Sequence, residues 1–459
     1  MRTCLVRNTR RYAWVFVLAV LQYGCKKNWL DAKTDKNLAV PSTLSDCQGL
    51  LDNTGEMNAN SCGIAEVASD GHGVLPSGWL LESDQEHNAY TWTHDKPVVS
   101  SPDWNASYRR VAYCNQVLEV LEEIKPGNAG DRQWWNEMKG AALFQRGRSF
   151  FELAQVFAPD YTLPLTVDRP GIPLRLTTDV NEPSVRATVG QTYDRILADL
   201  RMASQLLPLS PVYKTRPSKP AALAMLARVC LAMQAYDSAY AYADSCLLLQ
   251  NSLLDYNGLD MSSATPYPVP RFNSEVIFHA TLVKWGNILG DIMVDSSLYA
   301  LYDSTDLRRG CFFNCGVQAI QFKGSYYGGQ LLFSGLAVDE QYLIRAECRA
   351  RRGDSAGAMG DLITLLGKRY RAGHFAPPAV ANAKEVLAIV LRERRKELYL
   401  RGLRWTDIRR LNHTMEAAVT ITRVAGGDTF RLEPGSYRYV FPIPDDIIQV
   451  TGMAQNPGW

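Results

Sequence analysis

The sequence predicts a mostly α-helical protein in which a spine of helical hairpins carries a loop-rich, ligand-binding cap. Apolar and small residues recur at helical spacing through residues 107–157, 193–250 and 339–411. Residues 55–103 and 251–336 lack this period and combine glycine and proline with large aromatic rings, as loops do. We therefore expect an N-terminal part over 25–250, a cap over 251–338 and a C-terminal part over 339–459, packed as one globular unit.

Length and composition indicate a globular protein. The 459 residues are 46% hydrophobic and 21% charged, which suffices for a large core and argues against disorder. The formal net charge is only +2, and the basic residues are dispersed. Since nucleic-acid binding needs a concentrated basic surface, we exclude a nucleic-acid partner.

The first 24 residues have the pattern of a bacterial lipoprotein signal peptide. A basic start is followed by the apolar run Ala13–Leu21 and by Gly24 and Cys25. The apolar run is about half of the roughly 20 residues that a membrane-spanning helix needs. We predict removal of residues 1–24 and lipidation of Cys25, which would anchor the protein to a membrane.

Helices are expected in order along the mature chain. Thr43 and Asp46 mark a helix start, and residues 107–124 and 134–157 form a first hairpin. Further hairpins are predicted over 193–229, 219–247 and 339 onward, where Asp354 is a candidate N-cap. Small residues at helical spacing allow helices to approach closely, so the spine is predicted to be a set of degenerate tetratricopeptide-like repeats.

The region between these hairpins cannot continue the repeats. It contains the short alternating run 275–279, which predicts a strand, and the pair Gly328 and Gly329, which predicts a turn. We interpret residues 251–338 as a cap that packs against the spine.

Residues 391–411 are predicted to form one long helix with an internal ion-pair network. Arg394 and Arg401 fall on its apolar stripe, and an inward guanidinium group needs carboxylate partners. The expected structural network comprises Glu393, Arg394, Glu397, Arg404 and Asp407, with Glu397 four residues before Arg401. The alternative is a buried acid/base site, because such groups also have perturbed pKa values.

This helix resembles the late helix of the SusD/RagB family, through Glu393-Arg394, Glu397-Leu398, Gly402, Arg404 and Asp407. Arg401 departs from the family, which usually has an acidic residue before the glycine. The run from Tyr439 to Pro444 and the ending Gln455–Trp459 resemble the family's terminal signature. The resemblance implies a lipid-anchored outer-membrane protein facing the cell exterior. It would capture a glycan or other nutrient polymer and pass it to a TonB-dependent, SusC-like transporter barrel.

Rings in the two loop stretches are candidate ligand contacts. Sugars are bound by flat aromatic faces and by planar amide or guanidinium groups. The alternative for each ring is core packing. Asn105 and Asn287 could supplement the predicted ligand-binding set, which is Trp79, Asn88, Trp92, Trp104, Trp285, Tyr326 and Tyr327.

Catalysis has no support in the sequence, which contains no GxSxG, P-loop or dinucleotide motif. We therefore predict no enzyme activity and no cofactor. His87 and His94, with Asp84, Glu86 and Asp95, are the one metal-like cluster, and their spacing fits neither HExxH nor a calcium loop. A glycosidase pair among Asp70, Glu82, Asp84 and Glu86 is a second enzyme hypothesis.

The other function class is a helical-repeat scaffold of the cell envelope that binds a peptide along its spine. In that case the aromatic rings would belong to the core. Among the cysteines, Cys311 with Cys315 and Cys47 with Cys62 could form disulfides, whereas Cys114, Cys230, Cys246 and Cys348 are expected to pack as small apolar groups.

Overall fold

The structure is a computed structural model that describes residues 41–74, 76–162, 164, 167–262, 265–285, 293–316, 319–380, 382–414 and 418–459. The predicted signal peptide, Cys25 and Asn287 lie outside these residues. Residues Thr43–Trp459 form one compact unit, to which all elements below belong. Across the described ranges, no helix is long and apolar enough to cross a membrane.

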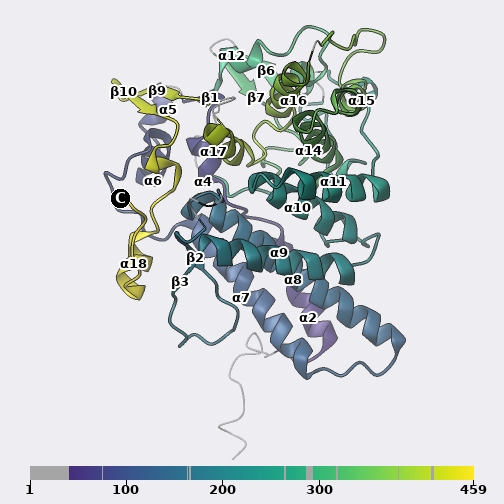
Figure 1. Ribbon diagram of the computed structural model, residues 1–459. Helices are drawn as coiled ribbons and strands as arrows, with labels where there is room; N and C mark the ends of the chain where they lie inside the picture. Colours follow the sequence, from purple (N-terminus) through teal and green to yellow (C-terminus); the bar gives the residue numbers. More distant parts are fainter. Residues whose placement is uncertain are drawn as a thin grey trace, which may run out of the picture. The chain divides into compact units, whose positions relative to one another are not determined.

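The spine is a row of helices in which each helix contacts the next (Figure 1). It consists of α7 (Pro102–Glu123), α8 (Ala129–Phe157), α9 (Val189–Leu206), α10 (Lys219–Ala232), α11 (Tyr236–Leu249) and α14 (Val338–Arg351), after which α15 (Ser355–Leu366) and α16 (Ala383–Glu397) both pack on α14. Alanines on α10 such as Ala221, Ala224 and Ala227 are fully buried, which permits this close packing. The predicted tetratricopeptide-like helical fold is confirmed.

The two side chains predicted to cap helix starts, Thr43 and Asp354, both do so. Thr43 accepts a hydrogen bond from the Asp46 amide, and the Asp46 carboxylate accepts one from the Thr43 amide, at the start of α2 (Leu44–Leu51). Asp354 accepts a hydrogen bond from the Gly357 amide at the start of α15. These contacts satisfy amide groups that have no partner within the helix.

The cap is built from short strands and helices. Strand β4 (Val276–Phe278) pairs antiparallel with β8 (Leu336–Ala337), which leads directly into α14. A second antiparallel sheet has the order β1-β5-β7-β6 and joins His72–Gly73, Met293–Val294, Ile320–Phe322 and Phe313–Cys315. Because β1 belongs to the N-terminal loop stretch, the two aromatic-rich regions share one sheet. The cap also contains η4 (Tyr256–Gly258), α12 (Ser296–Tyr299) and α13 (Arg308–Phe312).

The N-terminal loop stretch also contains helices. These are α3 (Thr54–Met57), α4 (Ile64–Ala68), α5 (Pro76–Trp79) and α6 (Asp84–Thr91). The prediction that residues 55–103 form only irregular loop was therefore wrong. Trp104 was also predicted to lie in this loop. Instead, α7 begins at Pro102 and carries Trp104 in its first turn. Proline is tolerated at this position of a helix.

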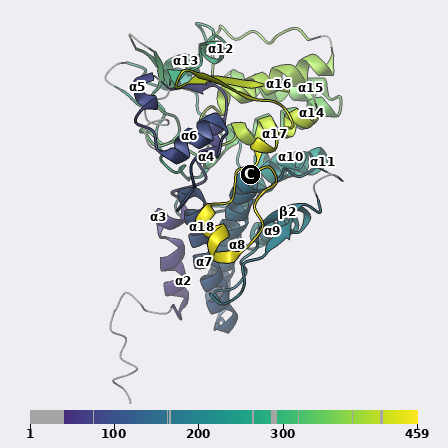
Figure 2. The ribbon, with the colours of Figure 1, turned by 90° about the vertical axis from the view of Figure 1, so that its left-hand side faces the viewer.

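The C-terminal segment crosses the spine (Figure 2). It contains the hairpin β9 (Ile421–Ala425) and β10 (Asp428–Leu432), η5 (Tyr437–Tyr439) and α18 (Asp445–Thr451), and it lies against the end of α8. The Phe441 amide donates to the Val156 carbonyl at 2.9 Å. On the same side, the hairpin of β2 (Pro170–Pro173) and β3 (Arg186–Thr188) follows α8.

Residues 391–411 are not one helix. Helix α16 ends at Glu397 and α17 (Arg404–Thr414) begins after a turn in which Leu400 has φ 55° and Gly402 has φ 74°. A Cβ atom at Gly402 would lie 2.9 Å from Leu282 Cδ2, so the turn also requires the small residue. The apolar stripe predicted from the sequence ran on through this turn, because Leu398 before it and Trp405 after it are both buried.

The cysteines with a described position are all free thiols, so neither Cys311 with Cys315 nor Cys47 with Cys62 forms a disulfide. As predicted, Cys114, Cys230, Cys246 and Cys348 are buried in the core.

Candidate functional site

Three of the predicted ligand residues line a single apolar pocket. Asn88, Trp92 and Trp285 meet there with Phe157, Phe441 and Trp459. The pocket has a volume of about 480 Å³, which includes its opening to solvent. The lining is mostly aromatic and aliphatic, with few polar groups, as is usual for small-molecule sites.

The pocket wall formed by α6 is fixed by local hydrogen bonds. Ser83 and Glu86 form a reciprocal cap at the helix start, and Trp92 ends the helix in a left-handed conformation with φ 55°. The Trp92 indole nitrogen donates to the Ala68 carbonyl at 3.0 Å. The Arg423 guanidinium carbon lies 4.8 Å from the centre of the Trp92 ring. Trp92 is therefore a rigid, buried part of the wall.

Trp285 forms another part of the pocket wall, and its indole nitrogen donates to Asp103 Oδ2 at 2.9 Å. The other Asp103 oxygen accepts hydrogen bonds from the Gly63 and Ile64 amides at 2.5 and 3.0 Å. Burial raises the pKa of Asp103 to about 6, although these three donors oppose the effect. One carboxylate thus fixes α4 and Trp285 against the start of α7.

The rim of the pocket comes from the C-terminal segment. The Asn456 amide nitrogen donates to the carbonyl groups of Phe157 and Phe441, at 2.9 and 2.7 Å. Trp459 donates to the Val440 carbonyl at 2.7 Å and is only half-buried, as is Phe441. Arg438 also lines the pocket. These rings are the accessible ones, in contrast to the buried Trp92 and Trp285.

The sequence interpretation did not include Phe157, Arg438, Phe441 or Trp459 among the ligand contacts. Phe157 was predicted only as the end of a helix, and the C-terminal run only as a family signature. The density of aromatic residues and prolines after Tyr437 was the available sign that this segment is extended and carries exposed rings.

The other predicted ligand residues lie outside this pocket. Trp79 is half-buried and its ring centre is 4.1 Å from that of His87. Trp104 is 5% exposed and packs on Tyr108 and Phe157. Tyr327 is half-buried beside Arg271.

Tyr326 is 1% exposed, and its hydroxyl donates to the carboxylates of Glu275 and Asp339. The two aromatic-rich regions therefore converge through Trp285 but not through Tyr326 or Tyr327.

The histidines of the metal-like cluster have other contacts. His87 Nε2 lies 2.8 Å from the Trp79 carbonyl oxygen, and His94 Nε2 lies 3.3 Å from Asp445 Oδ2. In the part of the chain that the structure describes, the only carboxylate, histidine or cysteine group close enough to share a metal ion is Glu275, Asp339 and Glu397.

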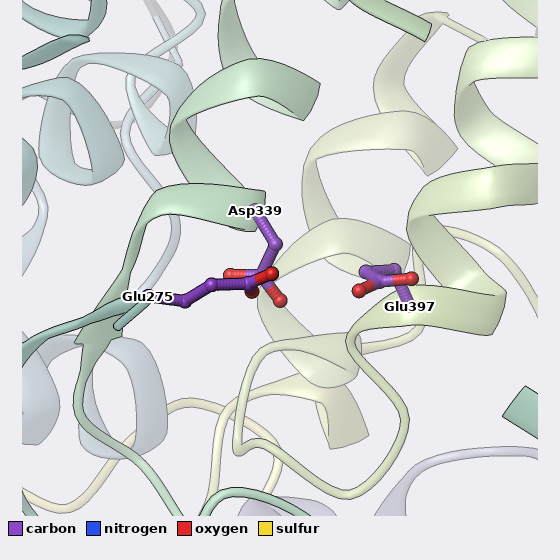
Figure 3. A group of neighbouring side chains, drawn as sticks. All are labelled: Glu275, Asp339 and Glu397. Carbon is purple, nitrogen blue, oxygen red and sulfur yellow. The ribbon is translucent and has the colours of Figure 1, made fainter. Parts of the chain in front are cut away.

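These three buried carboxylates come from the cap, α14 and α16. Figure 3 shows Glu275 and Asp339 side by side, with Glu397 facing them. Arg369 Nη2 donates to both oxygens of Glu275 at 2.7 and 2.9 Å, and Arg369 Nε donates to Glu397 at 2.7 Å. Arg401 Nη1 donates to Asp339 at 2.6 Å. A resident cation would have to displace these guanidinium groups, so the cluster fits an ion-pair network and not a metal site.

The five charged residues predicted to form a network do make buried or half-buried ion pairs. Arg394 pairs with Asp407 at 2.8 Å as expected. Glu393 and Glu397 both pair with Arg308 of the cap, at 2.7 and 2.9 Å. Arg404 pairs with Asp70 of the N-terminal stretch at 2.5 Å.

The predicted pairing of Glu397 with Arg401 was wrong, because the turn at Gly402 directs Arg401 toward Asp339. Burial raises the pKa of Glu275 to about 7, against the opposing effect of Arg369, and burial also raises the pKa of Asp339. The network thus connects the cap, the spine and the N-terminal stretch through ion pairs, which agrees with a structural role.

Two family models match the sequence. A family model described as "Starch-binding associating with outer membrane" matches residues 28–231, and the SusD family model matches residues 339–459. A search of curated proteins found no match.

Solved structures show the same fold. A SusD superfamily protein from Bacteroides thetaiotaomicron has a TM-score of 0.73 at 20% identity, covering 90% of this chain and 100% of its own. A SusD superfamily protein from Bacteroides vulgatus has a TM-score of 0.72 at 22% identity, covering 91% and 100%. A SusD-like carbohydrate binding protein from Bacteroides vulgatus has a TM-score of 0.64 at 18% identity, covering 90% and 97%.

The two family models match in order on either side of the cap and together span most of the sequence. The chain therefore belongs to the SusD/RagB family.

Proposed function

We propose that the protein binds a glycan in the aromatic pocket formed by Trp92, Trp285, Phe441 and Trp459, without turning it over. The observation that carries this proposal is the convergence of four large rings from three distant segments on one pocket. Aromatic faces bind the C–H side of a pyranose, and the amides of Gln85 and Asn88 at the same pocket can bind hydroxyl groups. The family description as starch-binding, and the carbohydrate binding of one structural relative, support the same ligand class.

The family and the N-terminal sequence support a proposal for the cellular setting. The family description includes association with the outer membrane. We propose that Cys25 carries the lipid anchor, that the protein faces the cell exterior, and that it passes its ligand to a TonB-dependent, SusC-like transporter barrel. Replacement of Cys25 by alanine should release the protein from membranes, and gentle detergent extraction of the wild type should recover the barrel with it. Equal membrane fractionation of both forms would contradict the anchor.

A glycan array followed by calorimetry on the best ligand tests the binding site. We expect Trp459→Ala to weaken binding by about 1 to 3 kcal/mol, because a half-buried ring can stack on a sugar. Its melting temperature should stay near that of the wild type. The control is Trp134→Ala, which removes a partly exposed ring on α8 at a distance from the pocket lining.

Several outcomes would contradict the proposal. The assignment of the glycan site to this pocket is wrong if Trp459→Ala and Trp134→Ala bind the glycan equally well. Binding of peptides and of no glycan on the arrays would favour the scaffold function. Release of shortened sugars by the purified wild type would contradict the absence of catalysis.

A further inference from the structure

A second cavity is lined by residues of α8, α10 and α17 and shares no lining residue with the aromatic pocket. Its volume is about 640 Å³ including its opening to solvent. Four guanidinium groups line it, those of Arg228, Arg394, Arg401 and Arg410. Each of these residues is at most 8% exposed. Buried N–H groups normally have a hydrogen-bond acceptor, so any guanidinium nitrogen here without one is informative.

Two of the four arginines each bind both oxygens of a carboxylate. Arg228 donates through Nε and Nη2 to the two oxygens of Glu340, at 2.8 and 2.6 Å. Arg410 donates through Nη1 and Nη2 to Glu347, at 2.6 and 2.8 Å, and through Nε to Asp407. These two groups form the fixed cationic wall of the cavity.

Arg401 is different because one whole edge of its guanidinium group is unused. Its Nη1 donates to Asp339, and the rings of Tyr326 and Phe333 lie 4.8 and 4.9 Å from the guanidinium carbon. Its Nε and Nη2 are buried and have no partner among the described residues. In Arg228 the same Nε and Nη2 edge holds both oxygens of a carboxylate. Arg146 with Asp199, Arg216 with Asp52 and Arg404 with Asp70 show the same arrangement.

Two further donors line the same cavity. Arg394 donates through Nε to Asp407 at 2.8 Å, whereas its buried Nη1 has no partner in the described ranges. The Ser334 hydroxyl is also buried and, over the same ranges, without a partner. Three guanidinium nitrogens and one hydroxyl, all from residues that line this cavity, are therefore available as donors.

The charge around the cavity is positive. This charge comprises the charged lining residues and the described residues that form ion pairs with them directly. The guanidinium groups are six: Arg110, Arg148, Arg228, Arg394, Arg401 and Arg410. The carboxylates are five: Glu152, Asp339, Glu340, Glu347 and Asp407. Water molecules could accept the hydrogen bonds, but only an anion also offsets the excess of one positive charge.

We propose that this cavity binds a small oxyanion of the sulfate or phosphate class. The Nε and Nη2 edge of Arg401 binds two of its oxygens, and Arg394 Nη1 and the Ser334 hydroxyl are the other donors. Bidentate pairing of this kind is what the planar guanidinium group favours for tetrahedral and planar oxyanions. The site is independent of the glycan pocket, with which it shares no lining residue.

The test uses selenate and sulfate as probes on the mature protein. Crystals soaked in sodium selenate should show an anomalous selenium peak at the Arg401 edge. In solution, 10 mM sodium sulfate should raise the melting temperature by at least about 2 °C over sodium chloride of equal ionic strength, because a ligand that binds only the folded state stabilises it. A parallel series with sodium phosphate distinguishes the two anions. A rise with either one supports the site.

Arg401→Lys keeps a cation beside Asp339 but removes the two-donor edge, so the sulfate-induced rise should disappear. The control Arg216→Lys changes an arginine whose edge is occupied by Asp52 at a distance from the cavity, and it should keep the rise. If Arg401→Lys does not fold, the selenate peak on the wild type decides alone. The proposal is overturned if only water density fills the cavity, or if Arg401→Lys retains the full rise, which would indicate an adventitious ion only.

Discussion

Replacing Arg369 with methionine should destabilise the protein by about 3 to 5 kcal/mol, the usual cost of breaking a buried ion pair from one side. Arg369 is fully buried and pairs with both Glu275 and Glu397. Methionine fills much of the same volume, so the lost charge dominates the effect. Glu397 keeps Arg308 as a partner at 2.9 Å, whereas among the described residues Glu275 keeps only the hydrogen-bond donors Tyr326 and the Leu254 amide.

The loss should depend on pH. The pKa of Glu275 is already raised to about 7 in the folded protein, above the 4.5 of the unfolded chain. Ionisation of such a group in the folded state costs stability above the folded pKa, and the cost is absent below the unfolded pKa. Without Arg369 the folded pKa rises further. The destabilisation should therefore be larger at pH 8 than at pH 5, where Glu275 is protonated.

Urea unfolding at the two pH values measures both quantities. Arg216→Met is the matched control, since it breaks a partly exposed pair with Asp52 and should cost no more than about 1 kcal/mol. Our reasoning is refuted if Arg369→Met costs no more than this control. It is also refuted if the loss is the same at pH 5 and pH 8.

Substitutions at three further positions have defined outcomes in urea unfolding. Burial raises the pKa of Glu66 to about 7. Glu66→Gln should therefore increase the free energy of unfolding by up to about 3 kcal/mol at pH 8 and by almost nothing at pH 4. An equal increase at both pH values would contradict this prediction. Gly402→Ala should lose about 2 kcal/mol, because φ is 74° there and the added Cβ would meet Leu282; an unchanged stability would show that the turn relaxes. Asp354→Ala should lose about 1 kcal/mol with the cap of α15, whereas Asp354→Asn should retain most of it.

Much of the fold could be predicted because local chemistry determines it. Thr43 and Asp354 begin helices through contacts with residues three positions away, and the apolar stripes of α7 and α8 are visible in the sequence. The long helix over residues 391–411 was an error of the same local method. A stripe of buried residues does not show that the backbone reverses its conformation at Leu400 and Gly402.

The site was predicted only in part because its contacts are distant in sequence. Trp285 and Trp92 were found as aromatic residues outside helical stripes, but Trp459 reaches them through the path of the C-terminal segment. The partner of Arg401 is Asp339, 62 residues away, and no helical spacing connects them. Burial of Tyr326 likewise depends on Glu275, which precedes it by 51 residues.

The charged contacts between cap and helices limit how the protein can be re-engineered. An exchange of residues 251–338 for the corresponding region of another protein, made to obtain a new ligand preference, would remove Glu275 and Arg308 together. Arg369 and Glu393 would then lose partners inside the protein. A successful chimera must therefore keep both charges in place and confine its sequence changes to exposed positions of the cap, such as those around Tyr327.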